Sequence, residues 1–171
     1  MIGQMIADSG RLCMGYTKRL MTGVTQEQFA RFAVIGDTVI ESNHPAFILG
    51  HLSQYPWQVV EQVGADASAV KPSDKYDALF SKNAKCLDDP NGTLYPPMEE
   101  VVEKFFASHE AAIEALLNAD DAVFSSPNPT EHLREKFSTV GSLHGFYLSG
   151  HMMLHIGQFS AWRRAMGLGP A

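Results

Sequence analysis

Residues 151–168 read HMMLHIGQFSAWRRAMGL, the end of a long helical pattern that we expect to cover residues 139–166. The sequence GLGP at residues 167–170 ends this pattern, since glycine and proline are helix stop signals. His151 and His155 lie four residues apart in HMMLHIGQ, residues 151–158, which otherwise reads as an apolar helix. A helix turns by about 100° and rises about 1.5 Å per residue, so the two side chains lie on one face, about 6 Å apart along the axis. Both imidazoles can therefore reach a single metal ion.

Three more long helical patterns precede this one. In each, apolar residues recur at steps of three and four, as on the buried face of an amphipathic helix. They cover residues 2–22, 43–64, and 96 or 97 to 117. Pro56 lies inside the second pattern, where it removes a backbone hydrogen bond, so we expect a kink at that point. Four long helices with few strand signals predict an all-α fold, a four-helix bundle, as a single domain over residues 1–171.

The connections between these helices carry weaker signals. Thr25 followed by Gln28 predicts a capping box for a short helix over residues 26–33. Residues 36–43 are expected to form a loop with a brief extended stretch. Residues 64–95 are the least regular part of the chain, and a connection of that length is typical of a lid or a binding loop.

The composition disfavours several functional classes. The net charge is −6 and no block of lysine and arginine stands out, so a nucleic-acid-binding protein is a poor fit. No run approaches the roughly 20 apolar residues that a membrane span needs. Charged side chains interrupt the first 21 residues, which indicates an amphipathic helix and not a signal peptide. We therefore expect a cytoplasmic protein with neither a membrane nor a nucleic-acid partner.

Two histidines do not make a tight metal site, because zinc and similar ions usually take at least three protein ligands. The two cysteines, Cys13 and Cys86, lack a CxxC spacing and are expected to be reduced thiols outside any metal site. His51, in FILGHLSQY at residues 47–55, lies among apolar residues, so its side chain is expected to point inward. Gly50 beside it would let a neighbouring element or a ligand approach closely. His51 is therefore the candidate third ligand.

The remaining histidines are weaker candidates. His144 lies about 10 Å from His151 along the helix axis, too far to bind the same ion easily. It is therefore only a candidate for a residue around the site that contacts a ligand or the substrate. His44 shares a helix face with the candidate third ligand but lies at the helix start, where we expect it to be solvated. His109 and His132 lie among charged residues and are expected to be ordinary core or surface histidines.

Spacing alone does not settle why the histidine pair is there. Burying two uncompensated imidazoles is costly; a metal ion is one way to satisfy them, and a hydrogen-bonded arrangement with Tyr147, one turn earlier, is another. Gln158 could orient a ligand or substrate, or could belong to the helix surface. Tyr55 and Tyr147 could donate hydrogen bonds to a bound anion, or could belong to the core. Arg163 and Arg164 could meet an acidic substrate, although a solvated helix end is the simpler interpretation.

Two segments resemble the signature segments of a known family. NHPAFILGHL at residues 43–52 and HMMLHIGQFSAWRRAMGL at residues 151–168 are similar to the two motifs of the DinB-like (DinB/YfiT) superfamily of small four-helix-bundle proteins. The resemblance covers the chain from about residue 43 to about residue 168. One departure is Phe47, where the family more often has tryptophan.

The resemblance implies an up-down-down-up bundle with a long crossover connection, and frequently a homodimer. It also implies a divalent metal held by one histidine of the second helix and two of the last, which here are His51, His151 and His155. Members with assigned activities include thiol-dependent S-transferases and a maleylpyruvate isomerase. Family resemblance therefore predicts a site more firmly than a reaction.

Three neutral imidazoles leave a divalent ion its full charge and one to three open positions, as in a catalytic metal site. The leading hypothesis is a metal-dependent enzyme of the thiol S-transferase or hydrolase type, acting on a small molecule, with a low-molecular-weight thiol as a further cofactor. Zinc and nickel are the first expectations for the ion, and manganese and iron the alternatives. No Asp or Glu accompanies the histidines, so the catalytic residues stay unassigned. Two alternatives stay open: a metal-binding or stress-related bundle without catalysis, and a metal-free bundle whose histidines bind an organic ligand.

Overall fold

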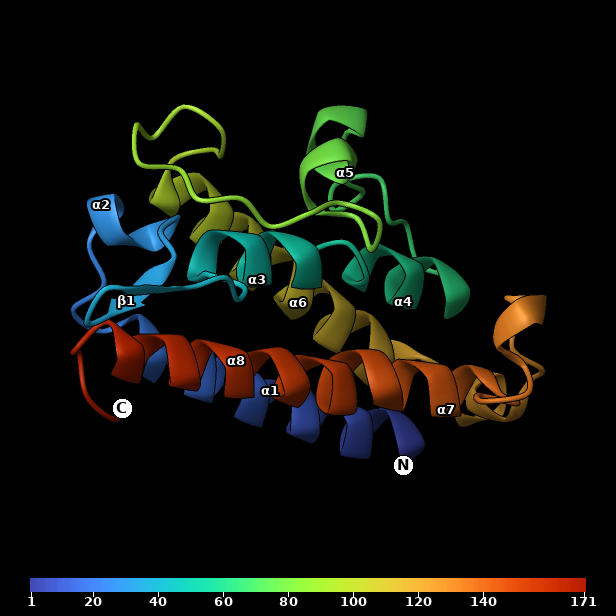
Figure 1. Cartoon of the computed structure of the whole chain (residues 1–171). Coiled ribbons are helices and arrows are strands. Elements are labelled where there is room, and N and C mark those ends of the chain that lie inside the picture. The colour runs from blue at the N-terminus through green and yellow to red at the C-terminus, as the bar shows by residue number, and fades with distance from the viewer.

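The structure, a computed structural model, describes residues 1–171 and is mostly helical, as Figure 1 shows. Helices of all types take up 59% of the chain. The long helices are α1 (Ile2–Met21), α6 (Met98–Asn118) and α8 (His151–Ala165). The prediction of a mainly α fold is confirmed. None of the helices combines the length and the apolar character that crossing a bilayer requires.

The helical backbone ahead of α8 is continuous with it. α7 (Val140–Gly145) begins at a capping box of Thr139 and Ser142. A π-helical turn, Phe146–Gly150, then leads directly into α8. Gly167, at a positive φ of 76°, follows the end of α8. The helix occupies the predicted part of the chain, but its apolar spacing does not predict the π-helical turn.

The second predicted helix is in fact two helices. α3 (Pro45–Leu52) ends ahead of Pro56, and Pro56 is the first residue of α4 (Pro56–Gln62). Proline suits that position, because the first backbone N–H of a helix has no partner within the helix. The expectation of one kinked helix over residues 43–64 is therefore wrong, since the helix stops and restarts at the proline.

Short elements fill the connections. β1 (Ala33–Ile35) and β2 (Thr38–Ile40) form an antiparallel hairpin, with Gly36 in its turn at a φ of 59°. α2 (Gln26–Phe29) begins at the predicted capping box but ends earlier than predicted, because the residues after it enter the hairpin. The other short helices are α5 (Asp74–Phe80) and two 3₁₀ turns, Asp121–Ser125 and Glu131–Leu133.

The helices pack in a closed series of contacts. α1 contacts α6 and α8, α6 contacts α3 and α4, and α3 contacts α8. α1 and α8 end side by side, where Nη1 of Arg163 donates to the Leu20 carbonyl at 2.9 Å, and Figure 1 shows that they run in the same direction. A cluster of 34 buried residues fills the space between the helices. This packing places the inward face of α3 against the inward face of α8.

Gly50 permits a close approach between α3 and the end of α5. A Cβ atom on Gly50 would lie 2.4 Å from the ring of Phe80, a side chain that is completely buried. Phe80 therefore cannot move aside without disturbing the core. The sequence-based expectation of a close approach at this glycine is confirmed, and the approaching element is the aromatic ring of α5.

We expect Gly50→Ala to lower the free energy of unfolding by about 3 kcal/mol, because the added methyl group overpacks a filled site. Urea unfolding measures this change. Gly157→Ala is the matched control, since a Cβ atom there has nothing within 4 Å. The control should stabilise the protein by up to about 1 kcal/mol through helix propensity. Equal effects of the two substitutions would contradict this account of Gly50.

Candidate metal centre

Three histidines converge where α3 meets α8. His51 comes from α3, and His151 and His155 come from the first two turns of α8. One ring nitrogen from each lies within 4.8 Å of the others, so the three residues could hold a metal ion. Each side chain belongs to a residue that is 7–8% exposed. The structure thus brings together the three residues that the sequence proposed, in a site almost closed to solvent; we call them the triad.

Hydrogen bonds orient two of the three imidazoles. Nδ1 of His51 lies 2.8 Å from the Phe80 carbonyl. A carbonyl oxygen only accepts, so Nδ1 carries the proton and Nε2 keeps its lone pair. Nδ1 of His155 donates in the same way to Oε1 of Gln158 at 2.9 Å, and Gln158 is held by Nδ2 of Asn43 at 3.1 Å. Both rings therefore present an unprotonated Nε2 to the centre of the triad, as metal-ligating histidines do.

The two histidines of α8 face each other through their Nε2 atoms. Nε2 of His151 lies 3.2 Å from Nε2 of His155, and Nδ1 of His151 is buried without a hydrogen-bond partner. In the neutral pair one of the two Nε2 atoms must donate to the other, and because Nδ1 of His155 carries its proton, the donor is Nε2 of His151. Two nitrogens bound to one zinc ion at about 2.0–2.1 Å, at a tetrahedral angle, would lie about 3.3–3.4 Å apart. The observed separation therefore suits two ligands of one ion.

The protonation states also suit metal binding. Burial lowers the pKa of His51 and of His155 below the usual histidine value. Burial lowers the pKa of His151 to about 3, and the neighbouring His155 and His51 add to the effect. All three imidazoles are therefore neutral at pH 7, which is the form that binds a metal. A neutral nitrogen set suits zinc, nickel and other borderline divalent ions.

Two tyrosine side chains, Tyr55 and Tyr147, lie beside the triad, on the side where α4 begins. The hydroxyl of Tyr55 lies 3.3 Å from Nε2 of His51, and its ring packs edge-on against His151 at 4.7 Å. Burial raises the pKa of Tyr55 to about 12, so its hydroxyl stays protonated and can donate. Tyr147 contacts Tyr55 through its ring, with centroids 4.9 Å apart. The hydrogen bond next to the triad thus comes from Tyr55, while Tyr147 contributes ring contacts.

The other histidines have structural roles. Nε2 of His144 pairs with Oε1 of Gln62 at 3.0 Å and connects α7 to α4, so His144 lies outside the triad. Nδ1 of His109 donates to the Phe105 carbonyl within α6 at 2.7 Å. His109 is 1% exposed and His132 is exposed, so the first is a core residue and the second a surface residue.

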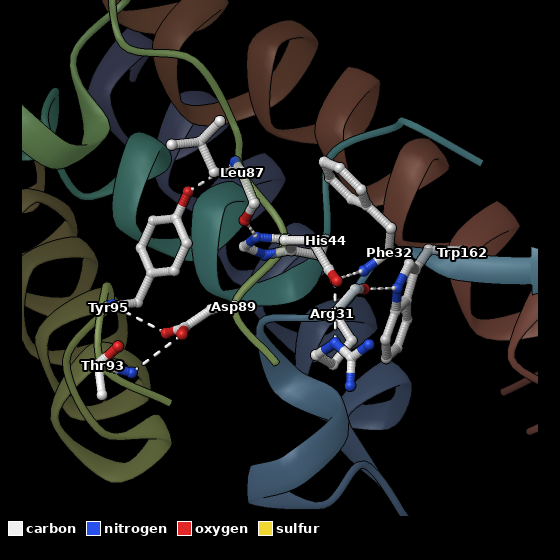
Figure 2. Close-up of polar contacts among 9 residues, drawn as sticks. Arg31, Phe32, His44, Leu87, Asp89, Thr93, Tyr95 and Trp162 are labelled. Atoms are coloured by element: carbon white, nitrogen blue, oxygen red, sulfur yellow. Dashed lines mark hydrogen bonds and ion pairs between the residues drawn. The ribbon is translucent and has the colours of Figure 1, made fainter. Parts of the chain in front are cut away.

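His44 is completely buried, so the expectation that it is solvated is wrong. Figure 2 shows the reason: residues of the long connection lie over the start of α3. The Leu87 carbonyl accepts from Nε2 of His44 at 2.9 Å, and Nδ1 of His44 caps α3 by accepting from the backbone N–H of Phe47. The Leu87 N–H in turn donates to the Tyr95 hydroxyl at 2.9 Å. A residue distant in the sequence therefore buries this histidine.

The end of the long connection is fastened to the rest of the fold. Asp89 accepts the backbone N–H groups of Thr93, Leu94 and Tyr95, and two of these bonds are drawn in Figure 2. Asp88 accepts from the backbone N–H of Phe32 at 2.6 Å and pairs with Arg31. Hydrogen bonds therefore hold residues 86–95 in place over the start of α3. The role of residues 64–95 as a lid or a binding loop stays a prediction.

Arg163 is buried, so the interpretation of Arg163 and Arg164 together as a solvated helix end is wrong for Arg163. It is 7% exposed and donates to backbone carbonyls at the ends of α1 and α8, those of Leu20, Thr22, Leu168 and Gly169. It joins the C-terminal ends of the two helices and is not available to an acidic substrate. Arg164 is exposed, and its guanidinium donates a hydrogen bond to Ser160.

Cys13 and Cys86 form no disulfide.

We expect Gln158→Leu to weaken metal binding by about 10- to 100-fold, because His155 loses the acceptor that orients its ring. The affinity is measured by competition with a chromophoric chelator. Gln62→Leu is the matched control: it removes the acceptor of a histidine outside the triad, so the metal affinity should stay at the wild-type value. A Gln158→Leu protein with unchanged affinity would show that this hydrogen bond does not orient a ligand.

No known family model matches the chain, and no curated protein or solved structure matches it either. Membership of the DinB-like superfamily therefore stays a prediction from the two motifs.

Proposed function

We propose that this chain is a divalent-metal-dependent enzyme of the thiol S-transferase or hydrolase type, built on a four-helix bundle of up-down-down-up order with a long crossover connection. His51, His151 and His155 would hold the ion. The observation that carries the proposal is the convergence of three buried, neutral imidazoles, two of which are oriented by hydrogen bonds at Nδ1. A set of three ligands leaves room for a reacting molecule.

A divalent ion bound by neutral ligands supplies Lewis acidity, which lowers the pKa of a water molecule or of a low-molecular-weight thiol beside it. The chain itself supplies orientation. The Phe80 carbonyl and Gln158 hold two ligand rings in place, and Tyr55 offers a protonated hydroxyl next to the triad. That hydroxyl can donate a hydrogen bond to an anionic group of the substrate or of the product.

One observation favours the non-catalytic alternative. The candidate ligand group consists of histidines only, without a carboxylate that could act as a general base. In the enzymatic proposal, solvent or the substrate must accept the proton that leaves the nucleophile. A metal-binding protein without catalysis would need no such group.

The test is a turnover assay on the metal-loaded protein. Glutathione, bacillithiol and mycothiol are each offered with monochlorobimane as the electrophile, and 4-nitrophenyl acetate is offered as a hydrolase substrate. The proposal expects turnover in at least one assay, its loss in His151→Ala, and a lower kcat with an unchanged metal content in Tyr55→Phe. Stoichiometric metal without turnover in any assay would support the non-catalytic alternative.

A further inference from the structure

A pocket with a volume of about 660 Å³ lies directly beside the triad. The two share a wall, because Tyr55 and Tyr147 line the pocket and the Tyr55 hydroxyl also contacts His51. The volume is in the range of pockets that bind small organic molecules. Three further aromatic residues line it: Trp57 on α4, Phe137 ahead of α7, and Phe146 in the π-helical turn.

The aromatic side chains connect the pocket to the triad. Phe137 stacks on Phe146 with ring centroids 4.7 Å apart, and Phe146 stacks on His151 with centroids 5.4 Å apart. Beside them, the rings of Tyr55 and Tyr147 lie 4.9 Å apart. Aromatic rings therefore extend from the pocket wall to a triad imidazole. Such rings pack well against the face or edge of another aromatic ring.

The charged residues of the pocket do not favour a charged ligand. Two lysines and two aspartates line it, and all four are exposed: Lys71, Lys82, Asp74 and Asp77. Their charges cancel, so the pocket attracts neither anions nor cations over the other. Nζ of Lys71 already lies over the ring of Trp57, 4.8 Å from its centroid. The aromatic wall is therefore the selective feature.

Gln54 adds a polar requirement. It lines the pocket, is 7% exposed, and has a buried side-chain nitrogen without a hydrogen-bond partner. A buried amide N–H without an acceptor is unfavourable, so the Gln54 amide would gain a hydrogen bond by turning toward a ligand oxygen in the pocket that this residue lines. An uncharged aromatic molecule with a carbonyl oxygen would pack against the aromatic wall and also provide an acceptor for the Gln54 amide.

We propose that this pocket binds an uncharged aromatic carbonyl compound, and that an aryl ester of this kind is the class of electrophile on which the triad acts. Water or a thiol would form a new bond to the acyl carbon, the acyl–oxygen bond would break, and the phenol would leave with the proton of the nucleophile. The second half of the proposal rests on the proposed function, whereas binding in the pocket does not require a metal. An experiment can therefore disprove binding in the pocket without disproving the proposed function, and the reverse.

The test of binding follows the indole N–H signals of the two tryptophans by NMR in metal-free protein, with acetophenone as the probe. Trp57 on α4 lines the pocket, whereas Trp162 lies near the C-terminal end of α8, where its Nε1 donates to the Arg31 carbonyl. Figure 1 shows α4 and this end of α8 on opposite sides of the molecule. Acetophenone should shift the Trp57 signal in a saturable manner and leave the Trp162 signal unchanged. Trp57→Phe assigns the two signals.

Matched ligands and variants separate aromatic recognition from general hydrophobic binding. Cyclohexyl methyl ketone, which has no aromatic face, should bind about 3 to 10 times more weakly than acetophenone. Phe137→Leu should weaken acetophenone binding by a similar factor, and Gln54→Met, which removes the amide N–H, by about 3-fold or more. Phe106→Leu is the control with an aromatic residue outside the pocket, and it should have no effect.

A Trp57 signal that does not move, or equal binding of the two ketones, would overturn the proposed pocket. An acetophenone affinity unchanged in both Phe137→Leu and Gln54→Met would do so as well. The substrate role is tested separately in metal-loaded protein, by the ratio of kcat/KM for phenyl acetate to that for cyclohexyl acetate, each divided by its uncatalysed rate of hydrolysis. This ratio should exceed one and should fall in Phe137→Leu. Pocket binding without this preference would retain the binding site and reject its role as the substrate pocket.

Discussion

Replacing His151 by alanine is expected to reduce the metal content of the purified protein from about one ion per chain to less than about a tenth of that value. The physical reason is that two neutral imidazoles from different helices do not hold a divalent ion tightly against solvent and buffer. His51→Ala and His155→Ala should have the same effect, because each removes one of the three converging nitrogens. Elemental analysis of protein purified without a chelator measures the change.

His132→Ala is the control, because His132 is exposed and lies outside the triad. Its metal content should equal that of the wild type. The wild-type protein should also unfold at a higher temperature with added metal, since an ion at 100 times its Kd stabilises the folded state by about 2.7 kcal/mol. A wild-type protein without stoichiometric metal, or a His151→Ala protein with the full amount, would remove the basis of the proposed metal site.

Metal-free protein is expected to lose stability steeply as the pH falls from about 6.5 to about 4. Burial lowers the pKa of His44 to about 4, despite Asp88 and Asp89 nearby, and burial lowers the pKa of His109 to about 4 as well. In the unfolded chain, histidine has a pKa near 6.5. Between pH 6.5 and pH 4 the unfolded state therefore binds protons that the folded state does not bind, so the free energy of unfolding falls as the pH falls. His44 and His109 should each lower the free energy of unfolding by up to about 3 kcal/mol over this pH range, and the decrease is complete below about pH 4.

Urea unfolding at several pH values between 7.5 and 4, with a chelator present, measures this dependence. The buried triad histidines add to it in the same direction, because burial lowers their pKa values too. His44→Asn isolates one contribution: asparagine can still cap α3, but it does not titrate. This variant should show a pH dependence that is smaller by about 3 kcal/mol over the same range. An unchanged dependence would mean that His44 is not the buried neutral group described.

Much of the helical framework could be predicted from the sequence. The start of α2 at the Thr25 capping box and the end of α8 shortly before Gly167 follow from signals carried by neighbouring residues. The break at Pro56 does not follow from the sequence, because a proline either bends a helix or begins a new one, and the sequence allows both. The π-helical turn that brings Phe146 onto His151 has no signal in the apolar spacing.

The sequence by itself determined the spacing of His151 and His155 on one helical face, because helical periodicity depends only on residues within a few turns of one another. It also marked His51 as an inward-facing residue. The place of Gln158, three residues after His155 on the same helix, also allowed it to orient that ring. Only the tertiary structure decided that His51 reaches the pair, that the Phe80 carbonyl orients the His51 ring, and that an aromatic pocket lies beside them.

The burial of His44 and Arg163 was also decided only by the tertiary structure. Each was expected to be solvated because it lies at a helix end, yet each is covered by a segment that is distant in the sequence. Burial depends on what packs above a residue, and the local sequence carries no record of that. The periodicity of one helix therefore determined which residues could form a metal site, and the packing of distant segments decided which of them do face one another.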